Sequence, residues 1–377
     1  MTVADVHRDA GPGPTLLALA VTDAAAYSLI GPVLPTLADE TGASVTTMTM
    51  LAATFPLTML IGFVPVGRLV HRGHTKVALL LGLALLAVGS LAFVVTSALW
   101  VLFIARAVMG LGSAGLWMGV TFRTLEYWPG QEYRRMSRVY AAYSIGALVG
   151  PLLAALNGTH LPFLAYLVLL AAVTPFLMLL PSPTQVPRYE RDHSWRRSPG
   201  FWYAALAIMF AMLGTGLIDG VLPLHFATHL TQSQIGIAYA GTAVVLALAS
   251  MVAGHHRHAT ALLVGGLGLV VGITVAGVSG AVPVWAVMLA VTGLGIGAAQ
   301  TGATGVLLDV VPTARIVVAM TVWSQMGIGG YLIGPAVGGP VVEHLGFAWL
   351  GIVPAAVGLA VVIAALIARR SEPAPAA

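Results

Sequence analysis

The chain has 377 residues, of which 58% are hydrophobic and only 8% are charged, and it contains no cysteine. Soluble domains carry roughly 25% charged residues, so this composition excludes an ordinary soluble protein. The missing cysteine excludes disulfides, iron–sulfur clusters and catalysis by a thiol. The net charge of +4 would suit a nucleic-acid-binding protein only if the basic residues formed a surface patch, and their distribution shows otherwise.

Apolar runs follow one another along the whole chain, and each can cross a hydrocarbon core of ~30 Å, which takes about 20 helical residues. The predicted spans are 15–37, 46–68, 75–97, 99–121, 138–158, 162–180, 201–225, 234–253, 259–279, 283–306, 317–340 and 347–368. They predict an all-α membrane protein with twelve transmembrane helices. The polar start of the chain does not resemble a cleavable signal peptide.

Basic residues lie on one side of this predicted topology. With the N-terminus in the cytoplasm, 16 of the 17 Lys and Arg residues fall in inner segments. The only Asp, Glu, Lys or Arg residues of the outer loops are the acids Asp39, Glu40 and Glu343. This asymmetry follows the positive-inside rule. It predicts a multi-pass protein in the lipid bilayer of the cell membrane, with cytoplasmic tails at 1–14 and 369–377 and no nucleic-acid partner.

The polar segment 181–200 divides the chain into two predicted six-helix bundles, 15–180 and 201–368. The two halves repeat short motifs in the same order at a nearly constant offset. The repeated motifs are GPVLP (31–35) with DGVLP (219–223), MGLGSAG (109–115) with TGLGIGA (292–298), and GALVGP (146–151) with GYLIGP (330–335). Internal repeats of this kind are typical of secondary transporters, whose site lies between the repeats near the membrane midplane.

Three motifs resemble those of the major facilitator superfamily, within it the twelve-helix drug:proton antiporters. GRLVHRGHTK (67–76) is similar to the family loop Gly-x-Leu-Ala-Asp-Arg-x-Gly-Arg-Arg, with His71 in place of its Asp. RAVMGLGSAG (106–115) matches the helix-four pattern Arg-x-x-x-Gly-x-Gly, and GALVGPLLAA (146–155) is similar to the antiporter motif Gly-x-x-x-Gly-Pro-x-x-Gly-Gly. The resemblance covers about 15–368 and implies two pseudo-symmetric bundles that alternate between inward-open and outward-open states.

Ionisable residues inside the membrane indicate a functional site. Asp23 lies near the middle of the first predicted span, so we expect it to bind and release protons. Arg106, which matches the arginine that assists proton transfer in the family, and Asp219 in the seventh span complete the predicted coupling residues. Arg106 and Asp219 lie at similar depth, and we expect them to pair. The alternatives are a structural carboxyl for Asp23 and a membrane anchor for Arg106.

Further predicted sites comprise the substrate cavity, a cytoplasmic latch and gating motifs. The cavity residues are Tyr27, Trp117, Gln300 and Gln325. The latch, which the resemblance places between the loop after the second helix and the end of the fourth, comprises Gly67, Arg68, His71, Arg72, Gly73, Lys76 and Glu126. The gating motifs, where small residues and proline permit close packing and bending, comprise Gly110, Gly112, Gly146, Gly150, Pro151, Gly330, Gly334 and Pro335.

These features predict a monomeric, proton-coupled transporter that exports a small amphipathic compound, a drug or a metabolite. An importer or facilitator of a sugar or other metabolite is the alternative, although the predicted cavity offers few amides. A receptor that does not transport, or an intramembrane enzyme, is a distant alternative. No metal site, cofactor or enzymatic motif is expected, and the absence of a phosphate-binding loop argues against direct use of ATP.

Overall fold

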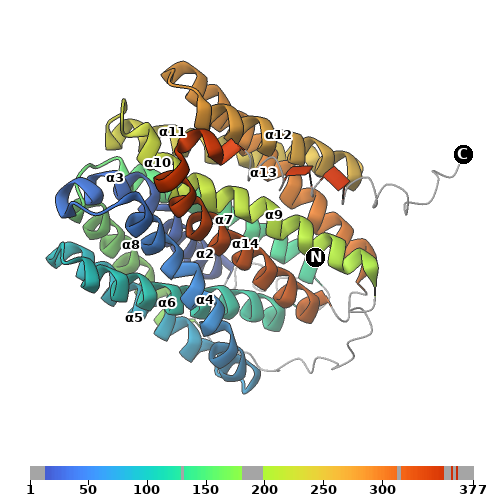
Figure 1. Cartoon of the computed structure of the whole chain (residues 1–377). Helices are drawn as coiled ribbons and strands as arrows, with labels where there is room; N and C mark the ends of the chain where they lie inside the picture. The colour runs from blue at the N-terminus through green and yellow to red at the C-terminus, as the bar shows by residue number, and fades with distance from the viewer. Residues whose placement is uncertain are drawn as a thin grey trace, which may run out of the picture. The chain divides into compact units, whose positions relative to one another are not determined.

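The computed structural model describes residues 13–128, 131–180, 198–311 and 316–351, together with 358–359 and 362–363. All regular elements in these ranges are helices (Figure 1). Most of the predicted linker and of the last predicted span, and nearly all of both predicted tails, lie outside the described residues.

The described residues contain nine helical segments long and apolar enough to cross a membrane. They are α2 (Gly13–Ser28) with α3 (Ile30–Thr41), α4 (Val45–His71), α5 (Thr75–Val95), α6 (Leu99–Tyr127), α8 (His160–Met178), α9 (Pro199–Gly220) with α10 (Leu222–Phe226), α11 (Gln232–Ala253), α12 (His258–Val278) and α13 (Val282–Val310). Two further long helices, α7 (Glu132–Ala154) and α14 (Ile316–Leu345), cover the fifth and eleventh predicted spans, and a short 3₁₀ helix, η3 (Phe347–Gly351), follows α14.

The first helix of each half is interrupted, a feature that the apolar pattern did not predict. The break between α2 and α3 falls at Leu29, and the break between α9 and α10 falls at Val221. Pro32 and Pro223 follow these breaks within the repeated motif, and each lacks the N–H that would continue the helical hydrogen bonds. Interrupted helices are common at transporter binding sites because they leave backbone carbonyls available.

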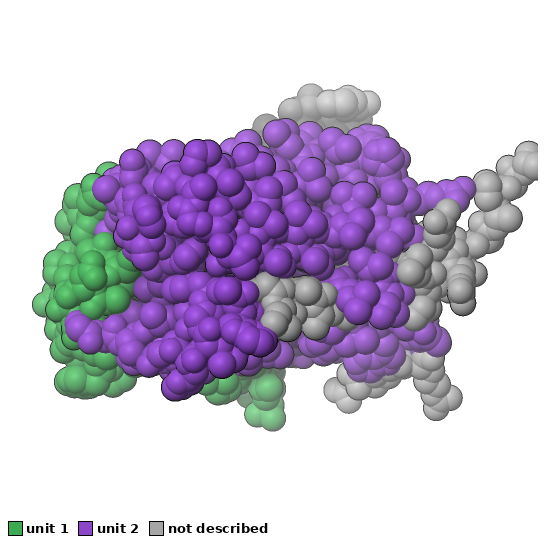
Figure 2. Space-filling view, turned by 45° about the horizontal axis from the view of Figure 1, so that its top comes forward, with its two compact units in different colours: residues 1–41, 54–188 green, residues 42–53, 189–377 purple. Residues whose placement is uncertain are grey.

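The chain divides into two compact units, unit 1 (1–41 and 54–188) and unit 2 (42–53 and 189–377), shown in green and purple in Figure 2. The start of α4 belongs to unit 2, whereas the sequence placed all of this helix in the N-terminal bundle. Two contacts explain the assignment. The Thr46 backbone N–H donates to the Glu343 carboxylate over 2.7 Å, and Thr49 packs directly against Gly339 of α14.

The internal repeat is preserved in the helix bounds. Both α12 and α13 begin and end 183 residues after α5 and α6, respectively. Within each pair, glycines bring the two backbones together. A Cβ on Gly112 would lie 2.8 Å from the Gly82 carbonyl oxygen in unit 1, and one on Gly295 would lie 2.6 Å from the Leu269 nitrogen in unit 2.

Candidate proton and substrate site

Asp23 of α2 is buried in unit 1, with 1% of its surface exposed. The Tyr143 hydroxyl of α7 donates a hydrogen bond to its Oδ2, and Ser113 of α6 lies close by. The other carboxylate oxygen, Oδ1, has no hydrogen-bond partner of good geometry among the described residues. A buried carboxylate with one oxygen lacking such a partner favours the binding of a proton or a cation, because an uncompensated charge is costly to bury.

The glycine motif of α7 explains how Tyr143 reaches Asp23. Gly146 lies directly against the Val21 carbonyl, and a Cβ on Gly150 would lie only 2.8 Å from the Ala25 carbonyl oxygen. Since small residues let two helices approach closely, α7 can place Tyr143, one turn before Gly146, on the carboxyl group of α2. The predicted close packing of this motif is thus found inside unit 1, and its gating role stays a prediction.

Aromatic side chains pack around Tyr143, the hydrogen-bond donor to the Asp23 carboxylate. The ring of Trp117 in α6 lies 4.7 Å from that of Tyr143 in an edge-on arrangement and 5.8 Å from that of Tyr140. Trp117 and Tyr27 were predicted, and both are partly exposed. Tyr140 and Tyr143 were not predicted, although their position one to two turns before the glycine motif could have indicated them. A carboxylate bound by a tyrosine that packs among other aromatic rings suits an organic cation.

Arg106 is fully buried in unit 1, where it contacts the first helix near its break. Its Nη1 donates to the Ala26 carbonyl over 3.2 Å, and its guanidinium lies 4.5 Å from the centre of the Phe55 ring. Close packing of Gly110 against the Phe55 carbonyl holds α6 beside α4. The proton-transfer role of Arg106 and its pairing with Asp219, which belongs to unit 2, stay predictions.

Unit 2 contains the remaining predicted coupling and cavity residues. Asp219 of α9 accepts a hydrogen bond of 3.0 Å from the Tyr331 hydroxyl of α14. The glycines of α14 again allow this approach, since a Cβ on Gly334 would lie 2.7 Å from the Leu213 carbonyl oxygen, and Gly330 and Pro335 also pack on α9. Of the predicted cavity amides, Gln300 lies 3.2 Å from the Met212 sulfur, and Gln325 is a partly exposed residue of α14.

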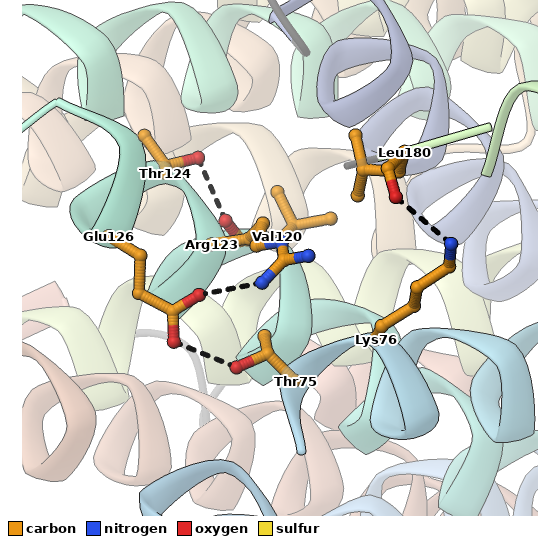
Figure 3. A network of polar contacts seen from close by, with 7 residues as sticks. All are labelled: Thr75, Lys76, Val120, Arg123, Thr124, Glu126 and Leu180. Atoms are coloured by element: carbon orange, nitrogen blue, oxygen red, sulfur yellow. Dashed lines mark hydrogen bonds and ion pairs between the residues drawn. The ribbon is translucent and has the colours of Figure 1, made fainter. Parts of the chain in front are cut away.

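A polar network joins the ends of α5, α6 and α8 in unit 1 (Figure 3). Glu126 is almost fully buried and forms an ion pair of 3.1 Å with Arg123, while its other oxygen accepts from the Thr75 hydroxyl over 2.9 Å. The sequence had placed Arg68, Arg72 or Lys76 within reach of Glu126. Lys76 instead donates to the Met178 carbonyl at the end of α8 over 2.8 Å and to the Leu180 carbonyl just beyond it over 2.9 Å.

The loop 67–76 ends α4 with a glycine cap. Gly73 has a positive φ of 82°, the His74 N–H donates to the Leu69 carbonyl, and the Gly73 N–H donates to the Val70 carbonyl. These bonds form a Schellman motif, which favours glycine at this position. His71 contacts the Phe122 ring edge-on, and Arg68 and Arg72 are exposed. The latch function of this loop stays a prediction.

Comparison with protein families shows where the chain belongs. The model described as "Major Facilitator Superfamily" matches residues 16–203 and 204–377. The chain belongs to the major facilitator superfamily. The two matches divide it almost at the predicted linker, and the all-helical structure, with its repeated halves, fits the major facilitator fold of this multi-pass membrane protein family.

Curated relatives include multidrug resistance protein 1 of Bacillus subtilis, which is 29% identical over 59% of this chain and 61% of its own length. The synaptic vesicular amine transporter of Rattus norvegicus is 26% identical over 76% of this chain and 59% of its length. The tetracenomycin C resistance and export protein of Streptomyces glaucescens is 31% identical over 49% of this chain and 35% of its length. The matched regions thus span about 60% of the first two relatives. The expected resemblance to the drug-resistance proteins of this superfamily is confirmed, whereas proton coupling stays a prediction.

Solved structures agree in fold. A POT family transporter in complex with a thioalcohol-conjugated peptide aligns with a TM-score of 0.74 at 13% identity, covering 95% of this chain and 96% of the other. The nucleoside transporter NupG aligns with a TM-score of 0.72 at 12% identity, covering 96% and 100%. At such low identity these likenesses show the fold alone.

Proposed function

We propose that this transporter exports a small amphipathic organic cation across the cell membrane in exchange for protons, with both termini in the cytoplasm. The names of its relatives support this proposal, since they include a multidrug resistance protein and amine transporters. The observation that carries it is the buried Asp23, whose Oδ1 has no hydrogen-bond partner of good geometry among the described residues and whose Oδ2 accepts from Tyr143, a residue packed against Trp117.

Asp23 would couple the two fluxes because a proton and a cation compete for the same oxygen. A substrate ammonium binds the ionised carboxylate, and a proton that binds the same group removes the charge that holds the substrate. Tyr143 serves both forms, since its hydroxyl donates to the carboxylate and can also accept from the carboxylic acid. Alternating access of the site to the two sides of the membrane then converts a proton gradient into substrate export.

Purified protein in proteoliposomes would test this function with labelled benzyltrimethylammonium, an aromatic cation that cannot cross the bilayer as a neutral base. With an acidic lumen, we expect uptake above that of protein-free liposomes. Collapse of the pH gradient by nigericin should abolish accumulation. Equal uptake with and without the gradient would indicate a facilitator, and uptake of a labelled sugar but not of the cation would support the importer alternative.

Competition would test recognition of the charge. Phenethylammonium should reduce uptake of the labelled cation, whereas 2-phenylethanol, a neutral compound of similar size, should compete far less. Equal competition by both compounds would show that charge is not recognised and would contradict the role given to Asp23 in substrate binding.

A further inference from the structure

Unit 2 repeats the arrangement around Asp23 with different residues. In unit 1, Asp23 accepts from Tyr143, and the Tyr166 hydroxyl of α8 donates over 3.0 Å to the carbonyl of Thr22, the residue before it. In unit 2, Asp219 accepts from Tyr331. There the Tyr239 hydroxyl of α11 donates over 2.6 Å to the carbonyl of Ile218, again the residue before the acid. In each unit one tyrosine binds the carboxyl and another holds the helix that carries it.

The internal repeat does not account for this likeness. Aligning GPVLP with DGVLP places Asp219 opposite Gly31, eight residues beyond Asp23. Eight residues correspond to about two helical turns, or roughly 12 Å along the helix. In the same way Tyr331 aligns with Ala147, one turn beyond Tyr143. The second carboxyl group is therefore no copy of the first, and it lies much closer to the break in its own helix, two residues before Val221.

Asp219 also has the chemistry of a group that gains and loses a proton. The ion pairs found among the described residues, Arg123–Glu126 and His258–Asp309, involve neither Asp219 nor Asp23. The Asp219 residue is partly buried, whereas Asp23 is fully buried. Tyr331 can donate to the carboxylate or accept from the acid, so the contact is compatible with both protonation states.

We propose that Asp219, with Tyr331 and Tyr239, is a second proton-binding site that acts independently of Asp23. This inference rests on the proposed function and sets its charge balance. In one direction the transporter changes between its two open states with both carboxyl groups protonated. In the other direction it changes state with both carboxyl groups ionised and one substrate cation bound. Two protons then move against one monovalent cation, so each cycle carries one net positive charge in the direction of the protons.

The sign of the voltage effect distinguishes the possible stoichiometries. In proteoliposomes with an acidic lumen, a lumen-positive potential set by valinomycin and potassium should accelerate benzyltrimethylammonium uptake if two protons leave for each cation that enters. One-for-one exchange would not respond to voltage, and simple cation entry would be slowed. We expect acceleration. A response of zero or of opposite sign in the presence of pH-driven uptake would overturn this inference alone, whereas loss of pH-driven uptake would overturn the proposed function too.

Variants assign the second proton to its residue. Asp219→Asn should lose the voltage response, measured relative to whatever pH-driven uptake it retains at zero potential. Asp309→Asn, a change at an exposed acid of the same unit, should keep both pH-driven uptake and the voltage response. Tyr331→Phe removes a hydrogen-bond donor that stabilises the ionised carboxylate, so as a single variant it should move the pH midpoint of uptake upward. In a double variant with Asp219→Asn, it should cause no further change. A voltage response that persists in Asp219→Asn would overturn the assignment.

A variant that exchanges the two charges tests whether Asp219 pairs with Arg106, and normalised rates and a conservative variant control for poor folding. If Asp219 instead pairs with Arg106, the double variant Arg106→Asp with Asp219→Arg should recover transport that each single variant loses. Such recovery would overturn independent action. All transport rates are normalised to the amount of folded, monodisperse protein inserted in the liposomes. Asp219→Glu, which keeps a titratable group, should retain the voltage response.

Discussion

At the scale of single residues, Asp23 has one oxygen bound by Tyr143 and the other unsatisfied. The sequence indicated Asp23, Tyr27 and Trp117 as candidate site residues, because an acid and aromatic groups within an apolar helix are unusual. It could not identify Tyr143 as the donor. That contact joins residues 120 positions apart, and it depends on which face of α7 turns toward α2.

Asparagine at position 23 is nearly isosteric with protonated aspartic acid but cannot release a proton. We expect Asp23→Asn to fold and insert, and to lose concentrative, pH-driven uptake of benzyltrimethylammonium. Asp23→Glu should keep some pH-driven activity with a changed pH optimum. Transport per inserted molecule is the measurement, and unchanged coupling in Asp23→Asn, with reduced stability, would assign Asp23 a structural role.

Trp117 should contribute to the binding of aromatic cations through its ring. Cation–π contacts are worth about 0.5–2 kcal/mol, so Trp117→Ala should weaken benzyltrimethylammonium binding by roughly 2- to 30-fold. Trp117→Phe should recover part of this loss. Trp100→Ala is the matched control, since Trp100 is a largely exposed residue of the same helix. Equal losses at both positions would show that the effect is not local to the site.

At the scale of helices, glycines determine which elements can exchange hydrogen bonds. The α7–α2 and α14–α9 pairs approach closely through Gly150 and Gly334, and each pair joins a tyrosine to an aspartate. The sequence indicated the close packing through the repeated Gly-Pro motif. It could not specify the partner helix, because small residues indicate that another helix packs closely but not which one.

A methyl group at Gly150 would collide with the Ala25 carbonyl 2.8 Å away. We expect Gly150→Ala to separate α7 from α2, to cost about 1–3 kcal/mol of stability as overpacking does, and to impair coupling. Gly329→Ala is the control, because nothing lies within 4 Å of a Cβ there. Thermal unfolding in detergent and pH-driven uptake are the measurements, and equal stability of both variants would contradict the packing argument.

The ends of the repeated helix pairs contain two acidic contacts of unequal burial. The Glu126 side chain is 3% exposed in its pair with Arg123, whereas the Asp309 side chain is 64% exposed in its 3.3 Å pair with His258. Removing one partner of a buried ion pair costs about 3–5 kcal/mol, and an exposed pair contributes about 0–1 kcal/mol. Glu126→Gln should therefore lower the melting temperature clearly, and Asp309→Asn should barely change it.

The same Glu126→Gln variant tests the predicted latch. If the network also favours the outward-open state, the variant should change the labelling rate of a cysteine introduced in the outer half of α9. A lower melting temperature with an unchanged labelling rate would leave Glu126 as a structural brace of α5 and α6 only.

At the scale of the whole molecule, the helical fold, the repeat and the family could be predicted, because hydropathy and motif order are written along the chain. The assignment of the start of α4 to unit 2 could not, since the Thr46–Glu343 contact joins residues 297 positions apart. The helix breaks at Leu29 and Val221 were within reach of prediction. Each lies two or three residues before a proline whose lost N–H interrupts the helix.

The shared helix α4 has a mechanical consequence. Its unit boundary falls between Ala53 and Thr54, and Pro56 lies in the next turn. Proline cannot donate to the carbonyl four residues earlier, that of Ala52, so α4 lacks a backbone hydrogen bond at this turn, as it does again at Pro65. If the two units move relative to one another, we expect α4 to bend at Pro56, which would act as a hinge. Pro56, an uncharged residue, would then influence how far the two units can move during transport.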